Sequence, residues 1–105
     1  MTTITTQEIK NKIANGESFV VDFFATWCGP CKILMRNLQI AEEKGFAAPV
    51  YTFDVDSDKE FAINELGIRS VPTVKYFKKG QIAETKTGVQ TPDQLIESIK
   101  SVTVI

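Results

Sequence analysis

The feature that most constrains this chain is a pair of cysteines separated by only two residues, in the run Trp27-Cys28-Gly29-Pro30-Cys31. These are the only cysteines among 105 residues. An apolar stretch typical of a β-strand precedes the pair at residues 18–24, and a helical pattern of apolar residues follows it at 32–43. The pair is therefore expected at a strand-to-helix junction, with Cys28 at the start of the helix.

This position favours a reactive thiolate at Cys28. The first turn of a helix offers unpaired N–H groups and a partial positive charge, and both stabilise a thiolate more than a thiol. We therefore expect the pKa of Cys28 to be lowered and assign Cys28 as the attacking thiol in disulfide exchange. Cys31 lies about one helical turn further along, on the same side of the helix, and is expected to be the resolving thiol.

Two other interpretations of the cysteine pair are a structural disulfide and half of a zinc site. Zinc usually takes four ligands, and this chain has no histidine and no third cysteine, so an intrachain site would need carboxylates or water. The acidic run Asp54, Asp56 and Asp58 lacks the glycine and distal glutamate of a calcium loop, and a strand end followed by a helix cap is favoured there. We expect no metal ion and no cofactor.

Composition and charge narrow the class of protein. The chain is 43% hydrophobic, which is enough for a core, and its 12 basic and 13 acidic residues leave a net charge of −1. The sequence has no basic block, so we expect neither nucleic acid nor an anionic membrane as a partner. No apolar run approaches the ~20 residues needed to span a bilayer. The first residues have no features of a signal peptide. We expect one cytoplasmic domain over residues 1–105.

The periodicity predicts the element order β-α-β-α-β-α-β-β-α. The expected strands are residues 2–5, 18–24, 48–55, 74–78 and 81–87, the last two forming a hairpin that turns at Lys79-Gly80. Three capping boxes are expected to begin helices, and they pair Thr5 with Glu8, Ser57 with Glu60 and Thr91 with Gln94. Right-handed crossovers make the early strands parallel and the hairpin adds antiparallel ones, which gives an α/β fold with a mixed sheet and helices on both faces.

Several segments resemble the thioredoxin family, in the same order and at similar spacing: Val21-Asp22-Phe23, Trp27-Cys28-Gly29-Pro30-Cys31-Lys32, residues 67–73, residues 77–80 and Lys86-Thr87-Gly88. The resemblance covers essentially the whole chain and implies a thioredoxin fold, a five-stranded mixed sheet flanked by four helices. It implies a monomer that reduces disulfides of client proteins through a redox-active Cys28–Cys31 disulfide. Thioredoxin reductase, a flavoprotein, is then expected to regenerate it, in electron transport and cell redox homeostasis.

Asp22 is the third residue expected to carry chemistry, because it lies inside an apolar strand. A buried carboxylate without partners is costly, so its pKa should be raised. The resemblance implies that Asp22 lies beneath Cys31 and helps to move its proton. The alternative is a carboxylate at a solvated edge of the sheet.

The resemblance also implies a docking surface for clients. Pro72 resembles a cis-proline that faces the cysteines and leaves room for a client strand to pair with the backbone of Val71; the alternative is an ordinary trans turn. The resemblance also implies an apolar rim around an exposed sulfur. The rim consists of Trp27, Gly29, Pro30, Val71, Pro72, Gly88 and Val89.

Three positions depart from the family pattern. Thr52 stands where relatives often have a lysine near the buried aspartate, and loss of that cation should raise the pKa of Asp22 further. Arg36 replaces a proline that kinks the active-site helix, so a straighter helix is expected. Phe24 takes the place of a second tryptophan. Two rival roles remain open, namely a non-catalytic thioredoxin-fold binding subunit and a dimer bridged by a metal on Cys28 and Cys31.

Overall fold

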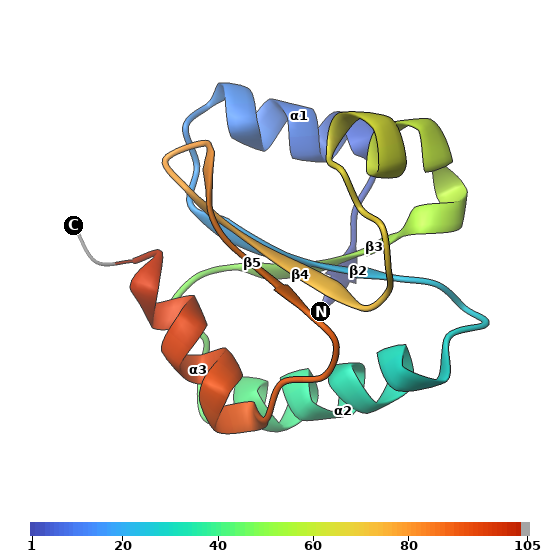
Figure 1. Ribbon diagram of the computed structural model, residues 1–105. Helices are drawn as coiled ribbons and strands as arrows, with labels where there is room; N and C mark the ends of the chain where they lie inside the picture. Colours follow the sequence, from blue (N-terminus) through green and yellow to red (C-terminus); the bar gives the residue numbers. More distant parts are fainter. Residues whose placement is uncertain (104–105) are drawn as a thin grey trace.

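A five-stranded sheet forms the middle layer of the computed structural model, which describes residues 1–103 (Figure 1). The last two residues of the expected domain, 104 and 105, lie outside the described residues. The strand order is β1-β3-β2-β4-β5. Both β1 and β2 pair with β3 in parallel, whereas β4 is antiparallel to β2 and β5, so the expected mixed sheet is confirmed. The strands are β1 (Thr2–Thr3), β2 (Phe19–Phe24), β3 (Val50–Asp54), β4 (Thr73–Lys78) and β5 (Gln81–Thr87).

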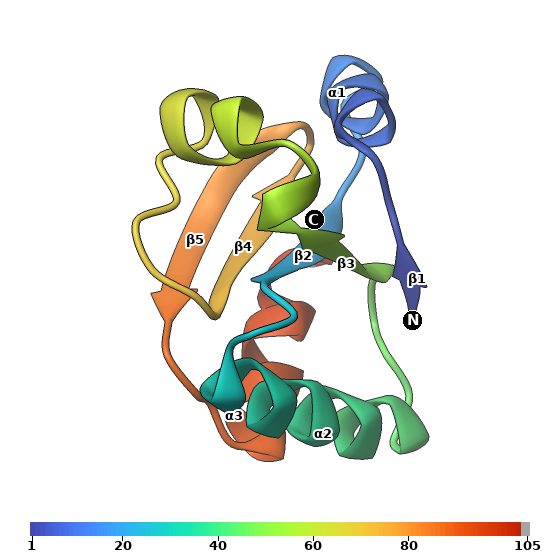
Figure 2. The ribbon, with the colours of Figure 1, turned by 90° about the vertical axis from the view of Figure 1, so that its right-hand side faces the viewer.

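Helices cover both faces of the sheet (Figures 1 and 2). Helix α1 (Thr6–Ala14) lies on one face, and α2 (Gly29–Glu43) and α3 (Pro92–Ser101) lie on the other. Successive residues of a strand point to opposite faces, so β2 supplies both cores. One core joins Val20 to Leu34, Leu38, Tyr76, Leu95 and Ile99, and the other joins Val21 to Ile9, Phe19, Phe23, Phe53, Phe61 and Phe77. Among the described residues, every helix is too short or too polar to cross a bilayer.

The predicted starts of two helices and the predicted turn of the hairpin are confirmed. Thr5 begins α1, because its hydroxyl accepts the N–H of Glu8 and the Glu8 carboxylate accepts the N–H of Thr5. Thr91 begins α3 with the same reciprocal arrangement to Gln94. At the hairpin, Lys79 and Gly80 have φ angles of 52° and 79°, and two positive φ values are what a tight two-residue turn between twisted strands requires.

The expected capping box at Ser57 is wrong. The Ser57 hydroxyl donates to the carbonyl oxygen of Asp54, within a short 3₁₀ turn named η1 (Val55–Ser57). Asp58 makes the cap instead, since its Oδ1 accepts the N–H of Phe61 at 3.1 Å ahead of the π-helix η2 (Glu60–Glu65). Aspartate is a stronger acceptor than serine, and a carboxylate is favoured at a helix start.

The acidic run therefore serves local structure, as the preferred interpretation expected. Asp54 Oδ1 accepts the N–H of Asp56 at 2.9 Å, and Asp58 Oδ2 accepts the Thr6 hydroxyl at 2.6 Å. The hydrogen bonds that Asp58 accepts from the Thr6 hydroxyl and from the Phe61 N–H lower the pKa of Asp58. The turn also shortens β3, which ends at Asp54 where residue 55 had been expected. At its other end β3 begins at Val50 where residue 48 had been expected, and β1 covers Thr2–Thr3 where residues 2–5 had been expected.

Candidate active site

Cys28 and Cys31 form the expected disulfide at the start of α2. Cys28 is the residue that caps the helix, with an extended backbone, and Cys31 lies in the first turn. Gly29 and Pro30 occupy the first helical positions, where a proline loses nothing by lacking an N–H. The backbone N–H of Cys31 donates to Sγ of Cys28 at 3.1 Å. The sulfur of Cys28 therefore takes the place that a serine or aspartate oxygen takes in an ordinary helix cap.

This geometry has an electrostatic consequence for the reduced protein. An N–H donor and the positive end of the helix dipole both point at Sγ of Cys28, and both favour a negative sulfur. The first turn of α2 contains no acidic residue that would oppose this effect. The sulfur of Cys31 does not occupy the cap position. The two thiols are thus placed in different electrostatic surroundings although they are only three residues apart.

The expectation of an exposed outer sulfur is wrong for the disulfide form. Cys28 is 4% exposed and Cys31 is 3% exposed. The half-buried side chains of Phe24, Val55 and Val71 pack around the pair, and the carbonyl oxygen of Val71 lies 3.7 Å from Sγ of Cys28. In the disulfide form, little of Cys28 is therefore exposed to a client.

Asp22 is fully buried on β2, as expected. Neither carboxylate oxygen has a hydrogen-bond partner, and burial raises the pKa of Asp22 to about 7. Asp22 lies on the same face of the sheet as Val20, which packs against residues of α2, so the carboxyl faces the helix that carries Cys31. The solvated-edge alternative for this residue is excluded.

Thr52 is the β3 residue directly beside Asp22 in the sheet. Its hydroxyl is hydrogen-bonded to that of Thr3 at 2.7 Å. On β4 the neighbour is the apolar Val74. Asp22 thus lies between Thr52, whose hydroxyl is already bonded to Thr3, and the aliphatic side chain of Val74. Neither neighbour supplies a positive charge that would favour the ionised carboxylate.

The loop before β4 and the loop after β5 meet beside the disulfide. The Val71–Pro72 peptide bond is cis, which confirms that prediction. The N–H of Gly88 donates to the carbonyl oxygen of Pro72 at 2.9 Å and joins the two loops. Trp27 is 71% exposed and Val89 is 45% exposed. Val71 is half-buried, and Pro72 is buried.

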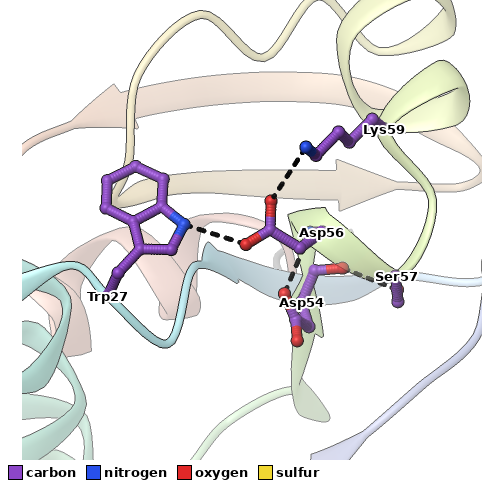
Figure 3. A network of polar contacts seen from close by, with 5 residues as sticks. All are labelled: Trp27, Asp54, Asp56, Ser57 and Lys59. Atoms are coloured by element: carbon purple, nitrogen blue, oxygen red, sulfur yellow. Dashed lines mark hydrogen bonds and ion pairs between the residues drawn. The ribbon is translucent and has the colours of Figure 1, made fainter.

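Asp56 is a residue of this region that sequence reasoning missed. The indole Nε1–H of Trp27 donates to Oδ2 of Asp56 at 2.9 Å, and Nζ of Lys59 lies 3.9 Å from Oδ1 of the same carboxylate (Figure 3). In the sequence Asp56 stands out only as part of an acidic run, and no local pattern links it to a tryptophan 29 residues earlier. The contact orients the exposed Trp27 side chain over η1.

Comparison with known proteins gives consistent matches. The family model described as Thioredoxin matches residues 1–101. A thioredoxin of Rickettsia prowazekii is 35% identical over 98 residues, which cover 91% of this chain and 92% of the relative. A thioredoxin of Mycoplasmoides gallisepticum is 38% identical over 96 residues, which cover 89% of this chain and 92% of the relative. The solved structure of Plasmodium falciparum thioredoxin has a TM-score of 0.82 at 29% identity and covers 96% of this chain and 98% of that one.

Proposed function

This chain belongs to the thioredoxin family and is a thiol–disulfide oxidoreductase, and we propose that it reduces the disulfides of client proteins with Cys28 as nucleophile and Cys31 as resolving thiol. The observation that carries this assignment is the hydrogen bond from the Cys31 N–H to Sγ of Cys28 at the start of α2. It supports a thiolate on Cys28, which is the attacking species in disulfide exchange.

The proposed cycle has two displacements. The Cys28 thiolate attacks one sulfur of a client disulfide, a mixed disulfide forms, and the other client sulfur leaves as a thiolate. The Cys31 thiol then gives up its proton and attacks Sγ of Cys28, so that the second client sulfur leaves and the Cys28–Cys31 disulfide forms. The client gains two electrons and this protein loses two. Asp22 accepts the proton of Cys31, directly or through water, and its pKa of about 7 suits a proton acceptor near neutral pH.

The remaining parts of the proposal concern partners and setting. We propose that clients dock on the rim of Trp27, Gly29, Pro30, Val71, Pro72, Gly88 and Val89, which the exposed Trp27 and Val89 side chains support. Thioredoxin reductase then regenerates the dithiol. Family membership supports that role, and with it electron transport and cell redox homeostasis. A cytoplasmic location, a monomer and a single domain over residues 1–105 are further parts of this proposal.

A second candidate role is a thioredoxin-fold subunit that holds a partner without redox chemistry. The observation in its favour is the large exposed side chain of Trp27, which would serve docking in either role. Cys28→Ser separates the two roles, because it should abolish reduction and leave simple docking intact.

The direct experiment is an insulin-type disulfide reduction assay, with and without a flavoprotein thioredoxin reductase. The unsubstituted protein should turn over repeatedly with the reductase, and Cys28→Ser should fall to background. Cys31→Ser should accumulate a mixed disulfide with the client, since the second displacement is missing. Full activity of Cys28→Ser would contradict the assignment of the nucleophile.

The role of Asp22 is tested by separating the two displacements in rapid-mixing kinetics. Asp22→Asn should slow release of the mixed disulfide by Cys31 and leave the first attack by Cys28 nearly unchanged. Equal slowing of both steps would contradict a role in moving the Cys31 proton.

A further inference from the structure

A hollow of about 350 Å³ lies beside the redox disulfide, next to η1 and η2. Its lining is mostly apolar and includes Val55, Ile63 and Ile68 together with Trp27 and Val71. Because the Val71 carbonyl oxygen is 3.7 Å from Sγ of Cys28, the hollow begins next to the proposed nucleophile. A client chain bound to Cys28 therefore passes its neighbouring side chains close to this hollow.

The charged residues that line the hollow are Asp56, Lys59 and Arg69. Both oxygens of Asp56 are engaged, one with the Trp27 indole and the other with Lys59 (Figure 3). The Lys59 pair is long at 3.9 Å, and the Lys59 side chain is 70% exposed, so this ammonium can turn towards a new carboxylate. Arg69 is exposed and makes no ion pair within residues 1–103.

The hollow thus combines an apolar lining with one excess positive charge, on a chain whose net charge is −1. An extended client segment presents every second side chain to a surface, so it can place an apolar side chain in the hollow and the side chain two residues away at the rim. A carboxylate at the rim would meet Arg69, whose planar guanidinium suits two parallel hydrogen bonds to a carboxylate.

We propose that this hollow selects client segments in which an acidic residue lies two positions before or after an apolar residue close to the reactive cysteine, with Arg69 and Lys59 as the residues that determine this preference. The inference rests on the proposed function, because it assumes that clients are held at Cys28. An exposed ion pair changes binding by about two- to fivefold. Glutamate at that position gains this attraction and lysine meets a repulsion of similar size, so a client with glutamate should be preferred over one with lysine by about tenfold.

The test compares two sets of disulfide-bridged peptides that differ only in carrying Leu-Ser-Glu (the Leu-Glu set) or Leu-Ser-Lys (the Leu-Lys set), at each position within four residues of one cysteine. At the position reduced fastest, kcat/KM of the unsubstituted protein should favour Leu-Glu by about tenfold at low salt, and salt should weaken the preference. Arg69→Glu should remove or reverse it. Lys78→Glu is the matched control, because it makes the same charge change at the far end of β4 and should keep the preference.

Equal kcat/KM for the two sets, or the same loss of preference in Lys78→Glu as in Arg69→Glu, would overturn the inference. A second measurement separates it from the proposed function. The same peptides with serine in place of cysteine are titrated against the oxidised protein, with Trp27 fluorescence as the signal. Tighter binding of the Leu-Glu set supports the inference even if no peptide is reduced, and equal binding of both sets contradicts it even if reduction is fast.

Discussion

Replacing the buried carboxyl group of Asp22 should change the stability of the protein by an amount that depends on pH, with a net gain at pH 8. The pKa of Asp22 is about 7 in the folded protein, against about 3.9 in an unfolded chain. A carboxyl whose pKa is raised on folding holds its proton more tightly in the folded protein than in the unfolded chain. The unfolded chain loses this proton first as the pH rises, so a penalty against folding develops between about pH 4 and pH 7 and stays constant above that.

The size of this penalty follows from the difference in pKa. At ~1.4 kcal/mol per pH unit, the raised pKa costs about 4 kcal/mol of folding free energy at pH 8, where the folded carboxyl is ionised, and about 1.5 kcal/mol at pH 5, where only the unfolded chain has lost the proton. Tyr76 lies on the same face of the sheet, and burial raises its pKa to about 12, so Tyr76 stays neutral throughout this range. Asp22→Asn removes the whole penalty but buries an amide without a partner, at a cost of about 1–3 kcal/mol that does not depend on pH.

The assay is unfolding in guanidinium, monitored by far-ultraviolet circular dichroism. The oxidised protein is used because its disulfide-bonded cysteines do not titrate. The stability gained by Asp22→Asn should be about 2.5 kcal/mol larger at pH 8 than at pH 5. Glu43→Gln is the control, because Glu43 is an exposed carboxylate on α2 and its removal should change little at either pH. The same effect of Asp22→Asn at both pH values would refute the claim that the buried carboxyl is uncompensated.

Two further predictions concern the stability of the fold. A Cβ atom at Gly80 would lie 2.5 Å from the carbonyl oxygen of Ile13, whereas one at Gly67, which also has a positive φ, would meet nothing within 4 Å. Gly80→Ala should therefore cost about 3 kcal/mol in urea unfolding and Gly67→Ala about 1 kcal/mol, and equal losses would contradict the contact. Lys75 is buried on β4, and burial lowers its pKa, so its charge opposes folding below that pKa. Lys75→Met should raise the stability at pH 7, and the gain should fade as the pH approaches the unfolded-state value of ~10.4; a gain unchanged at that pH would count against this explanation.

The sequence was sufficient for those parts of the fold that depend on local rules. Thr5 and Thr91 cap helices as predicted, because a threonine followed three residues later by Glu or Gln satisfies two N–H groups within one turn. The same rule failed at Ser57, because the Ser57 hydroxyl donates to the Asp54 carbonyl oxygen and the neighbouring Asp58 accepts the N–H of Phe61 instead. A rule based on spacing cannot rank competing acceptors, and the π-helical form of η2 has no comparable sequence signal.

The site was predictable where one short segment contains it and less so where distant segments meet. The position of Cys28 at the start of α2 follows from residues 18–43 alone, and the burial of Asp22 follows from its apolar neighbours. The contact of Trp27 with Asp56 depends on how η1 leaves the sheet after β3, which no local pattern records. The near-complete burial of the disulfide likewise arises from packing of Val55, which lies in η1, and Val71, which lies in the loop before β4.

The central claim is that the start of α2 makes Cys28 the acidic thiol of the pair, and the most direct measurement is the pH dependence of its alkylation. Reduced protein carrying Cys31→Ser leaves Cys28 as the only thiol, and its rate of reaction with iodoacetamide follows the thiolate fraction. The account predicts a midpoint at least one pH unit below the ~8.5 of a free cysteine, because the N–H of residue 31 and the helix dipole both favour the anion. A midpoint at or above that of a free cysteine would contradict it.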